Sequence, residues 1–215
     1  MRSTSDLIPA ARDNGHAFQG SDGDSSFGAL AGTTAGRFRR RHLLCETHDA
    51  ALATSVQQLF DEFFELEWIF DHRHGAAPAV LAAVAGELLL RQGLHCETMQ
   101  CKAEVRRSRK SFIFGLRDWA MPEQAPSHAA LLVEGTHLID FALGAIRRSF
   151  DREFPWGIVC PVNETHDHAV SLDVPGHGRI RWSSFASLDA SQQTMKTQAA
   201  VRALLREYDS AMQAA

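Results

Sequence analysis

Two residues of one short segment have the side chains that acid–base chemistry needs, His128 and Asp140. An imidazole exchanges protons near neutral pH, and a neighbouring carboxylate orients the ring and stabilises its charged form. Apolar residues 129–133 and 138–139 stand on either side of Glu134-Gly135, which predicts a β-hairpin with the histidine opening one arm and the aspartate closing the other. These two residues are the candidate catalytic pair.

The register of this hairpin decides whether the pair can meet, because side chains alternate between the two faces of a strand. A loop of residues 133–135 puts Leu132 opposite Thr136 and brings His128 and Asp140 onto one face. Such loops end on a residue in the left-handed conformation, and the sequence has glycine there. A two-residue Glu-Gly loop separates the pair instead. Both registers stay open, and so does a purely structural role for the two side chains.

Four other histidines have the spacing of metal ligands. They form two His-x-His segments, each containing or following an aspartate, at His72, His74, His166 and His168. On a strand this spacing places both imidazoles on one face, as zinc and iron sites use. The chain has 11 histidines, so chance pairing in loops is the simpler alternative. A zinc or iron enzyme is therefore a hypothesis that requires the two segments to be adjacent.

Composition and charge restrict the class of protein. The 215 residues are 45% hydrophobic and 22% charged, which is typical of a globular domain. A net charge of −4 gives no electrostatic argument for nucleic acid or an anionic membrane. The apolar runs are too short to span a bilayer, and no secretory signal is recognisable, so we expect a cytoplasmic protein. The four cysteines form no CxxC pair and are expected to be free thiols.

The candidate pair must be held by a domain that begins after a polar arm. Residues 1–42 are rich in Ser, Gly, Thr and Asp, which predicts a disordered or loosely packed arm, and residues 43–215 are expected to form a single α+β domain. Apolar spacing predicts a helix over residues 48–70, with Thr47 or His48-Asp49 as its N-cap.

A second helix should be buried, because it is nearly all Ala, Val and Leu. Pro78 suits its first position, and Gly93 its end. Strands are predicted at 94–106, 111–115, 157–160, 168–172 and 179–182, with residues 144–156 irregular. A last helix is expected over residues 189–212, capped by Ser187 or Asp189.

The order of these segments resembles the papain-like cysteine hydrolase superfamily in its transglutaminase-core form, which includes arylamine acetyltransferases and lasso-peptide leader peptidases. Residues 88–94 are similar to the end of that group's buried helix, and residues 128–133 with 138–140 to its His–Asp hairpin. The resemblance covers residues 75–142. It implies a buried helix packed on an antiparallel sheet, with His128 as base and Asp140 as the residue that orients it.

The chain departs from this group at the nucleophile. The resemblance places a cysteine at the start of the buried helix, but residues 75–79 read Gly-Ala-Ala-Pro-Ala. Cys96 and Cys101 follow the helix, on opposite sides of a regular strand. The first hypothesis is therefore a hydrolase- or acyltransferase-like protein, possessing the pair but lacking the usual nucleophile, acting on a peptide or small molecule. The second is a non-catalytic binding or regulatory domain without a cofactor.

Overall fold

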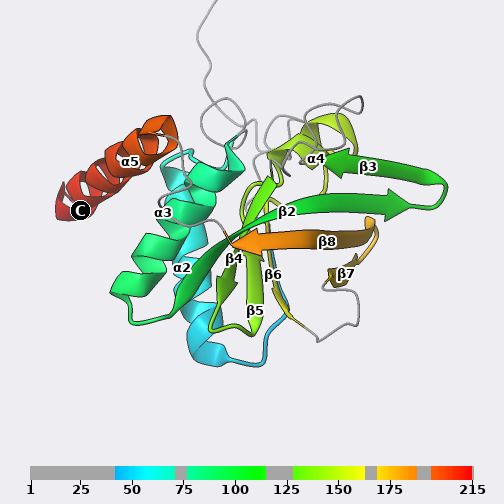
Figure 1. Cartoon of the computed structure of the whole chain (residues 1–215), viewed down its shortest axis with the longest axis horizontal. Coiled ribbons are helices and arrows are strands. Elements are labelled where there is room, and N and C mark those ends of the chain that lie inside the picture. Colours follow the sequence, from blue (N-terminus) through cyan, green and yellow to red (C-terminus); the bar gives the residue numbers. More distant parts are fainter. Residues whose placement is uncertain (1–41, 71–76, 115–127, 163–168, 188–194, 215) are drawn as a thin grey trace, which may run out of the picture.

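The computed structural model describes residues 42–70, 77–114, 128–162, 169–187 and 195–214. The fold is α+β, with one curled, mostly antiparallel sheet (Figure 1). Its strands are β1 (Leu43–Cys45), β2 (Cys96–Arg107), β3 (Lys110–Phe114), β4 (His128–Val133), β5 (His137–Asp140), β6 (Gly157–Pro161), β7 (Val170–Val174) and β8 (Gly178–Ser187). The helices of the described residues are α2 (Ala50–Glu65), α3 (Pro78–Arg91), α4 (Gly144–Ser149) and α5 (Met195–Ala214).

Strand β2 is the centre of the sheet. The strand order is β1-β6-β5-β4-β2-β8-β7, and β3 pairs with β2 outside this path. One edge of β2 pairs first with β4, over residues 96–101, and then with β3, over residues 103–107. Its other edge pairs with β8. All these pairs are antiparallel, whereas β1 lies parallel to β6. A long strand that changes partners lets the sheet curl around one of its faces.

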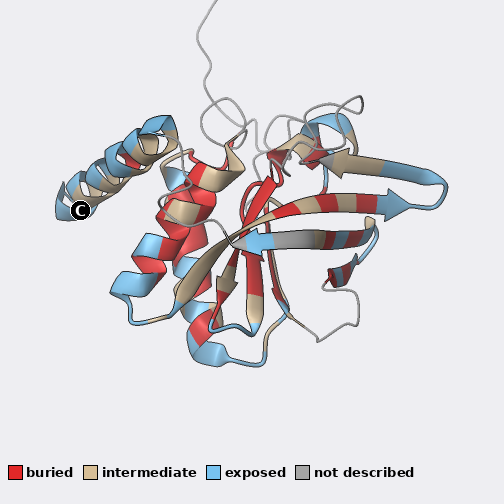
Figure 2. Ribbon diagram, in the orientation of Figure 1, coloured by how far each residue is buried: buried red, intermediate tan, exposed pale blue. Residues whose placement is uncertain are grey.

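The two faces of the sheet bury separate cores. Helices α2 and α3 cover one face, where Leu131, Val133 and Ile139 point, and α5 packs on the outside of α3. The alternate residues Ala130 and Leu138 point into a second core, enclosed by the curl of the sheet and by α4. Figure 2 shows buried residues along the inner side of α3 and through the central strands, while the β2–β3 hairpin is exposed at its tip. In the β4–β5 hairpin, alternate residues therefore point into different cores.

Helix α2 begins where the sequence indicates but ends earlier. Asp49 is the N-cap, and its Oδ1 accepts the backbone N–H groups of Ala51 and Leu52 at 2.9 and 3.0 Å. The predicted end at residue 70 is wrong, because the helix stops at Glu65 and Glu67 takes a positive φ of 59°. Residues 68–70 are nevertheless buried. Their burial explains why the apolar spacing continues beyond the helix.

Helix α3 is confirmed as the buried helix, with Pro78 at its start. Gly93 ends it with a φ of 89°, and the N–H of Leu94 returns to the carbonyl of Leu89 at 3.1 Å. Gly86 lets the sheet approach closely, since a Cβ there would lie 2.9 Å from the Leu131 side chain. The predicted helix packed on an antiparallel sheet is therefore present.

Three local expectations are corrected or limited by the structure. The segment predicted as irregular, residues 144–156, contains the short helix α4. Ser187 belongs to β8 and does not cap the last helix. Helix α5 is described from Met195, and Asp189 lies outside the described residues, as do residues 1–41 of the predicted arm. Strand β1 was not predicted; three residues carry too little pattern to be recognised.

Candidate active site

The β4–β5 hairpin brings the candidate pair onto one face, but in a register that differs from the predicted one. Leu132 lies opposite Leu138 rather than Thr136, and Val133 pairs with His137. The turn therefore moves to residues 134–136, where Glu134 and Gly135 both have positive φ, 51° and 67°. Val133 is fully buried in the helical core, and this burial outweighs its predicted place in the loop. The shift is two residues, so it preserves the shared face.

His128 and Asp140 are in direct contact. The Nε2 atom of His128 lies 2.7 Å from Oδ2 of Asp140, and each residue is only 1% exposed. A carboxylate has no proton to give, so we assign the shared proton to Nε2. Nδ1 is then the ring nitrogen that accepts a proton in any base reaction.

Two more donors hold the carboxylate. The indole Nε1–H of Trp182 donates to the same Oδ2 at 2.8 Å. The backbone N–H of Ala142, just beyond β5, donates to Oδ1 at 2.9 Å. Both oxygens are thus fixed, and a buried carboxylate with satisfied oxygens is a rigid acceptor. Trp182 was recognised in the sequence only as part of a strand; no local pattern links it to a residue 42 positions away.

The pair lies on the face of the sheet that α3 does not cover. His128 is paired with Cys101 of β2, and Asp140 with Ile158 of β6. Cys101 and Ile158 both belong to the core enclosed by the curl of the sheet, as does Trp182. The side chains that pack against α3 come from the alternate positions, such as Leu131. The buried helix and the pair therefore lie on opposite faces.

An irregularity in the sheet lies beside the pair. The β2–β8 register shifts between Gln100 and Lys102, so that Cys101 stands opposite two residues of β8, 184 and 185. Such a bulge bends a strand and re-aims its side chains. Here it falls at Cys101, the residue paired with His128 across β2 and β4. The sequence offers no signal for it.

The thiols near the pair are held in their protonated form. The cysteines are all free, and burial raises the pKa of each one. For Cys160 the pKa is about 12, because burial and then the negative charge of Asp140 disfavour the thiolate. The same two causes raise the pKa of Cys101. Cys101 and Cys160 are buried and Cys45 and Cys96 half-buried. Thiols whose pKa is raised stay protonated and are poor nucleophiles, so none of the four has the environment of an activated cysteine.

The predicted metal ligands cannot be placed. His72, His74, His166 and His168 lie outside the described residues. Within the part of the chain that is described, no group of three or more ligand-type side chains is arranged to hold a metal ion. The zinc or iron hypothesis therefore stays a prediction.

No protein-family model matches the chain, and neither a curated protein nor a solved structure matches it. The class that can be stated is an α+β fold with a curled, antiparallel-rich sheet. Among the described helices, none has the length and apolar character needed to cross a membrane.

Proposed function

We propose that the protein is related to hydrolases and acyltransferases of the papain-like, transglutaminase-core type, with His128 as general base and Asp140 as its orienting carboxylate. The observation that carries the proposal is the 2.7 Å contact between Nε2 and Oδ2, with both carboxylate oxygens fixed by further donors. A base held by an oriented carboxylate is the arrangement that activates a nucleophile in acyl transfer. The substrate class is a peptide or a small molecule with an acyl group.

In this proposal the proton of the attacking group passes to Nδ1 of His128. Asp140 keeps the proton on Nε2 in place and stabilises the imidazolium that forms. The proton on Nδ1 is then given to the leaving group. The low exposure of both side chains strengthens their electrostatic interaction, because little water screens it.

A second function is favoured by a different observation. His128 and Asp140 are each 1% exposed. Cys101, the cysteine paired with His128 between β2 and β4, has a raised pKa. A buried, satisfied His–Asp pair can serve as a polar element of the core that specifies a unique packing. The protein would then be a non-catalytic binding or regulatory domain with the same fold.

Labelling with electrophilic probes separates the two functions. We expect one side chain of the wild-type protein to react rapidly with a fluorophosphonate or a chloroacetamide, and to react 10²- to 10⁴-fold more slowly, on the order of a general-base contribution, in His128→Ala. The rate at each residue is measured by peptide mass spectrometry. His95→Ala, which removes an exposed imidazole from the turn before β2, is the matched control and should leave the rate unchanged.

A different labelling pattern would contradict a catalytic role for His128. Uniformly slow labelling of the wild-type chain, with no residue sensitive to His128→Ala, contradicts a catalytic pair and favours the binding domain. To keep a folding defect from imitating lost activity, His128→Gln is compared with His128→Ala. Both variants are checked by thermal unfolding before labelling.

A further inference from the structure

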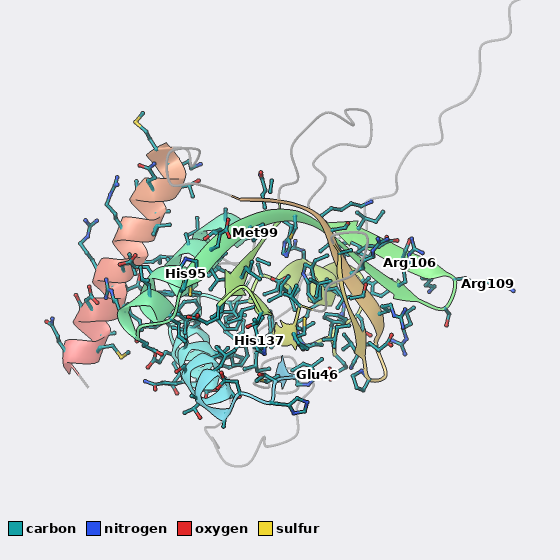
Figure 3. All side chains as sticks on the ribbon, turned by 60° about the horizontal axis from the view of Figure 1, so that its bottom comes forward. Glu46, His95, Met99, Arg106, Arg109 and His137 are labelled. Carbon is teal, nitrogen blue, oxygen red and sulfur yellow. The ribbon has the colours of Figure 1, made fainter. Side chains whose placement is uncertain are left out.

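A pocket of about 500 Å³ lies at the opposite end of the β4–β5 hairpin from His128. It is formed by the loop between β1 and α2, the start of β5 and the end of β6. Its lining residues are Cys45, Glu46, Thr47, His48, Asp49, His137 and Pro161. Figure 3 shows Glu46 and His137 on one side of the molecule, far from Arg106 and Arg109 of the β2–β3 hairpin.

The pocket contains a hydroxyl in contact with an imidazole. Oγ1 of Thr47 lies 2.8 Å from Nε2 of His137. The other ring nitrogen, Nδ1, lies 3.0 Å from Oγ1 of Thr136. A nucleophile within hydrogen-bond reach of a base, with the base oriented by a third group, is the arrangement of covalent acyl catalysis. In contrast to the buried pair, Thr47 and His137 are both partly exposed.

One set of hydrogen bonds satisfies all three side chains and directs the hydroxyl proton to the base. The backbone N–H of Asp49 donates to Oγ1 of Thr47 at 3.1 Å. We assign to His137 the tautomer in which the Thr47 hydroxyl donates to Nε2 and Nδ1–H donates to Oγ1 of Thr136. In this tautomer Nε2 is ready to take the proton when Oγ1 attacks.

Rigid elements hold both reacting groups. The N–H of Glu46 donates to the carbonyl of Val159, which extends the pairing of β1 with β6 up to the residue before Thr47. Asp49 caps α2 on the other side of the threonine. His137 is the first residue of β5 and is paired with Val133 and Pro161. The Thr47–His137 contact therefore joins two fixed parts of the fold rather than a free loop.

We propose that Thr47 and His137 form an acyl-transfer site separate from the His128–Asp140 pair. Oγ1 of Thr47 attacks the carbonyl carbon of an ester, and its proton passes to Nε2. The C–O bond to the leaving alcohol breaks, and the alcohol takes that proton. Water then gives a proton to Nε2 and attacks the carbonyl carbon of the threonyl ester. The C–Oγ1 bond breaks, the carboxylic acid leaves, and Oγ1 of Thr47 takes the proton back from Nε2. The carboxylates of Glu46 and Asp49 in the lining favour small neutral or cationic esters over anionic ones.

The test uses the full-length chain and a small neutral fluorophosphonate, which forms a phosphorus–oxygen bond at an activated hydroxyl with loss of fluoride. We expect an adduct on Thr47, located by peptide mass spectrometry. Thr47→Val should abolish it, and Thr47→Ser should retain it. His137→Gln should slow labelling by about 10²- to 10⁴-fold, the usual contribution of a general base.

Two variants serve as controls. Thr54→Val removes a hydroxyl of α2 that donates to a backbone carbonyl outside the pocket, and His95→Gln removes an exposed imidazole. Both should leave the Thr47 adduct unchanged. The proposal is overturned if the wild-type chain carries no adduct on Thr47, or if His137→Gln labels that residue as fast as the wild type.

Discussion

Replacing Asp140 with alanine is expected to lower the free energy of unfolding by at least about 3 kcal/mol, since each buried donor left without a partner costs about 1–3 kcal/mol. Asp140 accepts hydrogen bonds from His128, Trp182 and Ala142, and the variant leaves all three donors without that acceptor in a dry interior. Urea denaturation followed by circular dichroism measures the change.

An exposed aspartate provides the control for this prediction. Asp173 forms two short hydrogen bonds with Arg179 at the β7–β8 hairpin, and its side chain is 73% exposed. Water screens such a pair, so Asp173→Ala should barely change the free energy of unfolding. If Asp140→Ala costs no more than Asp173→Ala, the buried network is not formed as described.

The second large effect concerns Trp182, whose indole is fully buried in the core inside the curl of the sheet. Trp182→Ala should cost about 3–5 kcal/mol, as expected for removing a large buried aromatic side chain. Trp182→Phe keeps most of the ring but deletes the N–H donor to Asp140, so that Oδ2 retains only its contact with His128. The loss of this hydrogen bond to a buried carboxylate should cost about 1.5–3 kcal/mol.

The pair of Trp182 variants separates packing from hydrogen bonding. The loss of unfolding free energy in Trp182→Phe measures mainly the missing hydrogen-bond donor. The additional loss in Trp182→Ala measures the missing side-chain volume. In a double-mutant cycle, Trp182→Phe should lose most of its effect when Asp140 is already alanine, because the acceptor is gone. Fully additive free energies would contradict a direct contact between the indole and the carboxylate.

Local chemistry made the helices predictable. Pro78 begins α3 because the first helical position needs no N–H group. Gly93 follows its end because glycine readily takes the left-handed φ found there. Asp49 was identified as a possible N-cap because its side chain can accept the free backbone N–H groups at the start of α2. The predicted helix over residues 48–70 extended too far because Trp68 and its neighbours are buried without being helical. Apolar spacing reports burial, and burial does not require a helix.

The sequence reduced the candidate site to a choice between two hairpin registers and left both open. A period of two along each strand lets His128 and Asp140 share a face only in an even register, and the structure has an even register with the two side chains in contact. The exact register was wrong, because the burial of Val133 depends on α3 packing against the hairpin. Trp182 and the bulge beside Cys101 arise from pairing between β2 and β8, about 80 residues apart, and such distant pairing leaves no local trace in one sequence.

The resemblance to the papain-like group stays a prediction. The helix, the hairpin and the His–Asp contact are present. The pair, however, points to the face that α3 does not cover, and the described thiols have raised pKa values. A nucleophile activated by His128 must therefore approach from inside the curl of the sheet.

A carboxylate-oriented base requires the proton between His128 and Asp140 to sit on Nε2, and the imidazole nitrogens of His128 can be observed directly by long-range proton–nitrogen NMR. At neutral pH we predict a proton on Nε2, with a signal that is lost or strongly shifted in Asp140→Asn. A bare Nε2 with the proton on Nδ1, unchanged in that variant, would contradict a carboxylate-oriented base at this site.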